Sequence, residues 1–229
     1  MGSRKRTVFI AAGAVVLLVG GAGVGYAFHK QRVLAAACDS VTAYAEQTGG
    51  VVHYPGDGSR IVIIGDSYTT GDHLTDRQDA WPHKYAEISG ADVYVLGEGG
   101  TGYANAGFFG TGRFHERLDA AVDLKPDTLV IAGGLNDVGQ PVQDAAQGLL
   151  EQATSEATVI VVGPVDVPAI EGEAAVSEEL EHAARAAGAT FVPAMEWDVD
   201  FLADGVHLTP EGHERYADLF ADHTAKTAP

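Results

Sequence analysis

Cysteine is nearly absent from this chain, and its scarcity removes two kinds of site. Cys38 is the single cysteine among 229 residues, so neither an intramolecular disulfide nor a cysteine-based zinc site can form. Basic residues are also scarce, with 14 lysines and arginines against 32 aspartates and glutamates. Without the three basic residues at 4–6, the remaining 11 leave a net charge of −21. That charge repels phosphate backbones, so we expect no nucleic-acid partner.

Two common catalytic motifs are missing as well. No Gly-x-Ser-x-Gly sequence occurs, which excludes the nucleophile elbow of the α/β-hydrolases. The histidines show no His-Glu-x-x-His or similar spacing, so we expect neither a bound metal nor a cofactor. Most histidines are therefore expected to be surface or core residues, namely His53, His73, His83, His115, His182, His213 and His223.

A long uncharged run lies near the N-terminus. Three basic residues at 4–6 precede residues 8–28, a run of 21 residues without a charge. As a helix this run spans about 31 Å, close to the hydrocarbon core of a bilayer. A single-span anchor is therefore favoured, with residues 1–7 in the cytoplasm and the rest of the chain outside it. Two alternatives also place the rest of the chain outside the cytoplasm: a signal cleaved near Ala35-Ala36-Ala37, and a lipid on Cys38.

The rest of the chain divides into a stalk and one domain. Residues 29–58 are predicted to form a stalk or linker, and residues 59–229 a domain of ordinary size. Within that domain, short apolar runs alternate with helical patterns. The alternation predicts a three-layer α/β/α sandwich around a five-stranded parallel sheet. The predicted strands are Arg60–Gly65, Asp92–Leu96, Thr128–Ala132, Thr158–Val162 and Thr190–Val192, and the predicted helices cover about 80–89, 113–122, 142–153, 173–187 and 210–220.

Ser67 follows the first of these apolar runs. Residues 61–64 are consecutive isoleucine and valine, typical of a central strand that is covered on both faces. Gly65 permits a sharp exit, so Ser67 lies in the loop at the carboxyl end of the strand, where open α/β sheets bind ligands. Polar motifs follow the next two predicted strands at the same edge, Gly97-Glu98-Gly99-Gly100-Thr101-Gly102 and Gly134-Leu135-Asn136-Asp137. We expect the three loops to converge on one crevice.

A fourth motif, Asp204-Gly205-Val206-His207, completes the groups that acyl transfer through serine requires. Ser67 supplies the hydroxyl, His207 takes its proton, and Asp204 orients the imidazole. The Ser67 N–H, an N–H of the glycine-rich segment and the Asn136 amide can bind the oxyanion. The candidates for lining a substrate pocket are Tyr68, Phe108 and Phe109.

These blocks, in this order, resemble the SGNH hydrolase family, also called GDSL esterases and lipases. The resemblance covers about residues 60–220, with Tyr68 where the nucleophile block most often has leucine. It implies a flavodoxin-like sheet, no metal, and hydrolysis of an ester through an acyl-enzyme. It also implies that Asn136 is the oxyanion amide and Gly100 the oxyanion glycine, with Gly99 as the alternative. Family substrates include acetylated sugars, short acyl esters, lysophospholipids and thioesters.

The sequence therefore predicts a serine esterase of a bacterial cell envelope. Its substrate would be a carboxylic ester, in an envelope lipid, an acylated polysaccharide or a small molecule. One alternative is an acyltransferase that uses the same triad on an envelope acceptor. The other is a catalytically silent, membrane-anchored binding domain, against which the complete set of catalytic residues argues.

Overall fold

The computed structural model describes residues 31–227, in which a first helix covers residues 31–48. The predicted membrane helix at 8–28 lies outside the described residues. No helix between residues 31 and 227 combines the length and the apolar character that crossing a membrane requires. From Tyr44 onward the chain forms one compact unit.

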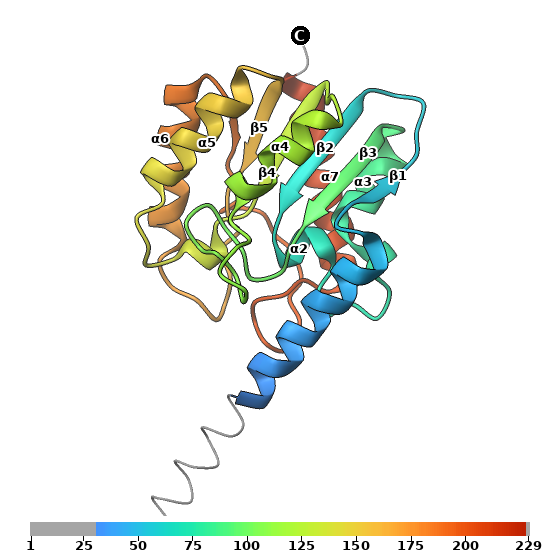
Figure 1. Cartoon of the computed structure of the whole chain (residues 1–229), viewed down its shortest axis with the longest axis vertical. Helices are drawn as coiled ribbons and strands as arrows, with labels where there is room; N and C mark the ends of the chain where they lie inside the picture. Colours follow the sequence, from blue (N-terminus) through green and yellow to red (C-terminus); the bar gives the residue numbers. More distant parts are fainter. Residues whose placement is uncertain (1–30, 228–229) are drawn as a thin grey trace, which may run out of the picture. The chain divides into compact units, whose positions relative to one another are not determined.

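A six-stranded sheet forms the centre of this unit, with the strand order β1-β3-β2-β4-β5-β6 (Figure 1). Five strands run parallel, as the sequence predicts, and they are β2 (Arg60–Gly65), β3 (Asp92–Gly97), β4 (Thr128–Ala132), β5 (Thr158–Val162) and β6 (Thr190–Val192). The α/β class is confirmed.

The prediction of five strands is wrong, because β1 (Val52–Tyr54) adds an antiparallel edge strand next to β3. This strand lies within residues 29–58, the predicted stalk. It is only three residues long, too short for a clear alternating pattern. Side chains hold it in place: His53 Nε2 lies 2.6 Å from Asp92 Oδ1, and the His53 ring stacks on Tyr94. The edge of β3 is thereby covered.

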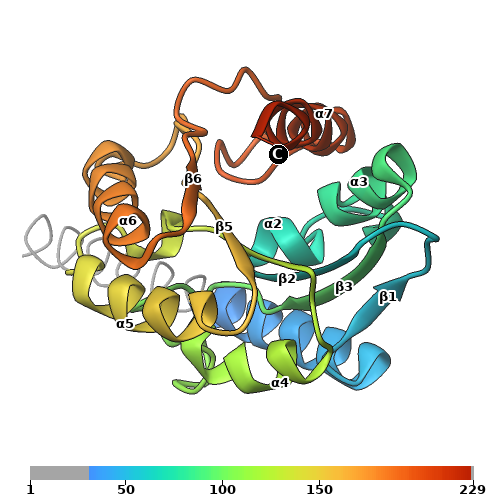
Figure 2. The same ribbon diagram turned by 90° about the horizontal axis from the view of Figure 1, so that it is seen from above.

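Helices cover both faces of the sheet (Figure 2). On one face lie α3 (Trp81–Ser89) and α7 (Pro210–Thr227). On the other lie α4 (Leu118–Asp123), α5 (Gln143–Thr154) and α6 (Glu173–Ala187). The predicted helix at 113–122 is in fact a 3₁₀ turn, η2 (Phe114–Arg117), followed by the short α4.

The side chains of β2 explain why its sequence is apolar without alternation. Ile61 and Ile63 point into the cluster under α3 and α7, whereas Val62 and Ile64 point into the cluster under α4, α5 and α6. All four are buried. Because a central parallel strand faces protein on both sides, every position must be apolar.

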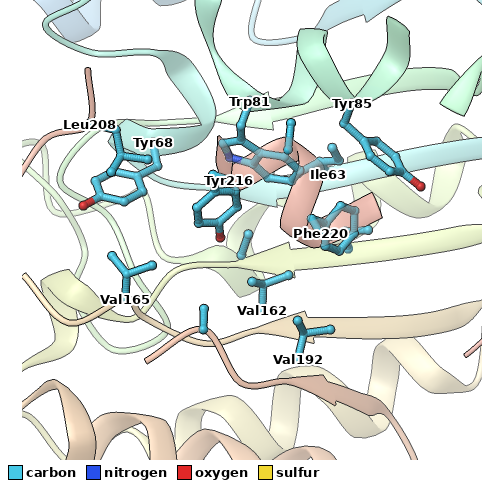
Figure 3. Packing of buried hydrophobic residues seen from close by; sticks show 14 of the residues in the cluster. Ile63, Tyr68, Trp81, Tyr85, Val162, Val165, Val192, Leu208, Tyr216 and Phe220 are labelled. Atoms are coloured by element: carbon cyan, nitrogen blue, oxygen red, sulfur yellow. The ribbon is translucent and has the colours of Figure 1, made fainter. Parts of the chain in front are cut away.

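An aromatic group fills the layer between the sheet and the α3–α7 pair (Figure 3). The Trp81 ring lies 5.2 Å from the Tyr216 ring and 5.4 Å from the Phe220 ring, measured between centroids. Tyr85 meets Phe220 edge to face at 4.8 Å. Edge-to-face contacts of this kind add to the stabilisation that burial of the rings provides.

The strand register brings three loops together. Gly65 at the end of β2 pairs with Gly97 of β3 on one side and with Ala132 of β4 on the other. The chain passes from β2 to β3 and then crosses to the opposite side for β4, so the direction of the strand order reverses at β2. In open α/β sheets, ligands bind at this point of reversal. The expected convergence of the first three loops is therefore present.

Replacing Phe220 should destabilise the whole unit. We expect Phe220→Ala to lower the free energy of unfolding by about 3–5 kcal/mol, because it leaves a cavity among aromatic rings. Ile88→Ala on α3 is the control, since Ile88 is 50% exposed; it should change stability by at most about 0.5 kcal/mol. Urea unfolding of both variants measures the difference, and equal effects would contradict this description of the core.

Candidate active site

Ser67 is the first residue of a four-residue helix, α2 (Ser67–Thr70), that starts directly after β2. Asp66 caps this helix, and its Oδ1 accepts a hydrogen bond from the Tyr68 N–H at 3.0 Å. A Cβ on Gly65 would lie 1.9 Å from Thr69 Oγ1, so only glycine allows the chain to turn this sharply. Ser67 is partly exposed, at the carboxyl end of the central strand.

Asp204 and His207 are in direct contact, as their motif predicts. His207 Nδ1 lies 2.7 Å from Asp204 Oδ2. The other carboxylate oxygen accepts the N–H groups of Val206 at 2.9 Å and of His207 at 3.0 Å. Burial opposes ionisation, but these hydrogen bonds prevail and lower the pKa of Asp204 to about 2. Asp204 is therefore a carboxylate at neutral pH and favours a proton on the Nδ1 of His207.

A narrow turn presents this pair. Phe201 and Leu208 form an isolated antiparallel bridge, and the Leu202 N–H donates to the His207 carbonyl at 2.7 Å. Gly205, at the tip, has a φ of +67°, which favours glycine. The Tyr68 hydroxyl donates to the Val206 carbonyl. This bond joins the segment that carries the serine to the loop that carries the histidine.

The predicted pocket residues lie in different surroundings. Tyr68 is buried in the core under α3 and α7, where its hydroxyl supports the histidine loop. Phe108 and Phe109 are exposed, by 39% and 51%. The Phe108 ring covers Gly100, since a Cβ on that glycine would lie 2.8 Å from it. Of the three, the two phenylalanines are the ones that solvent, and hence a substrate, can reach.

Ser67 and His207 are not hydrogen-bonded to each other within the part of the chain that the structure describes. The His207 ring instead lies against His73, with 4.0 Å between ring centroids. Serine and histidine in catalytic sites often move into hydrogen-bonding distance only when substrate is present. The structure thus brings two of the three predicted catalytic residues into contact and places the third in the adjoining segment.

The glycine-rich loop is held by Asp137. Its carboxylate accepts the backbone N–H groups of Tyr103, Ala104 and Asn105 at 2.8–2.9 Å. Gly102 must lack a side chain, because a Cβ there would lie 2.3 Å from Asp137 Oδ2. The last residue of the Gly-x-Asn-Asp motif therefore anchors the loop that begins after β3.

The predicted oxyanion donors lie around this loop. The Asn136 Nδ2 donates to the Thr101 carbonyl at 2.9 Å and lies 3.4 Å from Asp66 Oδ2. Gly100 has a φ of +77° and is partly exposed, whereas Gly99 is buried. Exposure thus favours Gly100 over Gly99 as the glycine whose N–H a substrate oxygen could reach.

A family of known proteins matches this chain. The family model of the GDSL-like lipases and acylhydrolases matches residues 63–215, about two thirds of the chain. The chain belongs to this family. It is accordingly a hydrolase of the GDSL esterase and lipase type.

Solved structures share the fold at low sequence identity. Est24, a carbohydrate acetylesterase from Sinorhizobium meliloti, is 18% identical with a TM-score of 0.64, and the match covers 75% of this chain and 100% of Est24. The psychrotrophic esterase EstA from a Pseudoalteromonas species is 17% identical with a TM-score of 0.61, covering 74% of this chain and 98% of EstA. No curated protein sequence matches this chain.

Arg117 connects the loops of this GDSL-family site, and the sequence analysis missed it. One guanidinium nitrogen donates to the carbonyls of Gly65 and Leu96, both at 2.8 Å. The other donates to Thr101 Oγ1 at 2.8 Å and to the Gly112 carbonyl at 3.1 Å. Burial lowers the pKa of Arg117 to about 10, against the opposing effect of Glu98, so it remains charged at neutral pH. Its place on a short helical turn offers no sequence signal for this role.

His73 and His213 differ from each other, although the sequence analysis treats them alike. His213 is a core histidine, as expected: burial lowers its pKa to about 3, and its Nδ1 accepts the Trp81 N–H at 3.2 Å. His73 is exposed and lies against the candidate catalytic histidine. Burial by its neighbours, followed by the charge on His207, lowers the pKa of His73.

Asp66 should make stability depend on pH. Burial raises its pKa to about 7, against the Tyr68 N–H that lowers it, and the nearby Asp137 raises it further. In the unfolded chain its pKa is about 3.9. The stabilisation from protonated Asp66 is therefore fully present below about pH 4 and is lost as the pH rises through about 7.

Asp66→Asn isolates this contribution, because asparagine stays neutral and still caps a helix. We expect the unfolding free energy of the wild type, relative to that of the variant, to fall between pH 5.5 and pH 8. Urea unfolding at the two pH values measures it. A constant difference would show that Asp66 is ionised in the folded protein throughout this range, and a rise would contradict the raised pKa.

Proposed function

We propose that the protein is an extracytoplasmic serine esterase in which Ser67, His207 and Asp204 form the catalytic triad. The observation that carries the proposal is the 2.7 Å contact between Asp204 and His207, in a loop bonded to the residue after Ser67. A carboxylate, an imidazole and a serine hydroxyl in this order are the groups that acyl transfer requires. The location rests on the uncharged run at 8–28 and the basic residues before it.

The reaction then proceeds in two steps, acylation of Ser67 and hydrolysis of the acyl-enzyme. The Ser67 hydroxyl attacks the ester carbonyl while His207 Nε2 takes its proton, and Asp204 stabilises the imidazolium that forms. The proton passes to the leaving alcohol, which departs and leaves an acyl group on Ser67. A water molecule, deprotonated by His207, attacks the acyl-enzyme, and the proton returns to Ser67 as the acid leaves.

Three donors would hold the oxyanion. The Ser67 N–H lies at the start of α2, where helical N–H groups have no partner within the helix. The Gly100 N–H would be the second. The Asn136 amide would be the third, after it exchanges the Thr101 carbonyl for the substrate oxygen. Loss of one such donor typically lowers the rate by roughly 10²–10³.

The acyl group is proposed to be short, such as acetyl. The side chains that a substrate can reach beside Gly100, Phe108 and Phe109, are 39% and 51% exposed. A long acyl chain resting on them would therefore stay largely in water. The carbohydrate acetylesterase with the same fold is consistent with an acetylated sugar as substrate. We therefore propose short acyl esters of a carbohydrate as the substrate class.

Turnover of p-nitrophenyl esters of increasing acyl length tests both the catalytic triad and the preference for a short acyl group. The acetyl ester should be hydrolysed with the highest kcat/KM. Ser67→Ala and His207→Ala should lower kcat by roughly 10⁴–10⁶, and Asp204→Asn by about 10⁴. His182→Ala, an exposed histidine on α6, is the matched control and should keep wild-type activity.

Three other outcomes would contradict the proposed function. Undiminished activity in Ser67→Ala would rule out the serine mechanism. An acyl-enzyme that water releases slowly and a sugar alcohol releases fast would favour the acyltransferase. A folded wild-type protein that turns over no ester of any length would favour the silent binding domain.

A further inference from the structure

Next to the candidate triad lies a second imidazole that the proposed reaction does not use. His73 sits in the turn after α2 with a φ of +71°, a left-handed conformation that is unusual for a residue other than glycine. The turn is held by the Asp72 N–H, which donates to the Ser67 carbonyl at 2.9 Å, and by the Arg77–Asp72 ion pair at 2.7 Å. This turn places the His73 ring beside His207, at 4.0 Å between centroids.

We infer that His73, Asp204 and His207 form a binding site for a divalent transition-metal ion such as Zn²⁺, and that the bound ion switches the esterase off. Each residue offers one ligand atom, and the three atoms lie within 4.8 Å of one another. Two imidazoles and a carboxylate are a ligand set that Zn²⁺ readily accepts, with water in the fourth position. Mg²⁺, which prefers oxygen ligands, should bind poorly.

A tetrahedral site requires the three ligand atoms to move closer together. With metal–ligand bonds of about 2.0–2.1 Å, neighbouring ligand atoms of a tetrahedral site lie roughly 3.3 Å apart. His73 and Asp204 are both exposed, so their side chains can rotate toward His207 without disturbing the core. The chain also carries a net charge of −18, which raises the local concentration of cations.

A bound ion and the proposed reaction exclude each other. A metal that takes a lone pair of His207 leaves the imidazole unable to accept the Ser67 proton, and a metal on Asp204 weakens its hold on the His207 ring. The ion is thus an inhibitor and not a cofactor. Inhibition rests on the proposed function, whereas binding rests only on the three side chains.

Isothermal titration with ZnCl₂ tests binding on the full chain, purified without a histidine tag and freed of metal by a chelator. The wild type should bind one ion at this site, and Ser67→Ala should bind it equally well although its catalysis is lost. His73→Phe keeps a ring against His207 but removes the ligand atom, so affinity should fall at least about tenfold. His182→Phe, an exposed histidine on the other face of the sheet, is the matched control and should bind as the wild type does.

Inhibition is measured separately, with each variant compared with its own metal-free rate of ester hydrolysis. The zinc concentration for half inhibition should rise at least about tenfold in His73→Phe and stay unchanged in His182→Phe. Zinc affinity that is equal in wild type and His73→Phe, or Mg²⁺ that binds as tightly as Zn²⁺, would overturn the inference. If the proposed esterase function is wrong, the result is distinguishable: Zn²⁺ would still bind in the titration, but no ester would be hydrolysed.

Discussion

The site depends on the way β2 is enclosed: protein covers both of its faces, and neighbouring strands pair with both of its edges. A strand enclosed in this way cannot bend gradually, so the chain has to leave the sheet at one residue, and Gly65 is the residue without a side chain to obstruct the turn. The turn puts Ser67 at the start of a helix and in front of the loops after β3 and β4. Arg117 then fixes the ends of β2 and β3 by donating to a carbonyl of each. One guanidinium thus supports both the serine segment and the glycine-rich loop.

Three carboxylates near this edge have different surroundings and therefore different tasks. Asp204 is stabilised as an anion by three hydrogen bonds, which suits a group that has to stabilise an imidazolium. Asp137 also accepts three N–H groups, but burial is the larger effect and raises its pKa. Asp66 accepts one backbone N–H in a fully enclosed place, and its pKa rises furthest toward neutrality. Environments that separate pKa values in this way commonly separate the roles of acidic groups.

The central strands and the motifs at their ends could be predicted because their signals are local. An apolar run such as residues 61–64 reflects burial on both faces, and the Asp204–His207 contact spans only three positions. The features that the sequence did not reveal depend on residues far away in the chain. The edge strand β1 exists because β3 offers it an edge, and Arg117 acts on residues 21 and 52 positions away. The fold places the His73 ring against His207, a contact that no sequence pattern indicates. Such roles arise from tertiary contacts and have no periodicity or spacing to reveal them.

The proposed function requires Ser67 to be a nucleophile that its surroundings activate. Labelling of the folded, metal-free full-length protein with a fluorophosphonate, followed by peptide mass mapping, tests it most directly. We expect one phosphonate group per chain, attached to Ser67, and no label at that residue once the protein is unfolded in urea. A label on another residue, or a folded protein that takes up no label, would show that Ser67 is not the nucleophile.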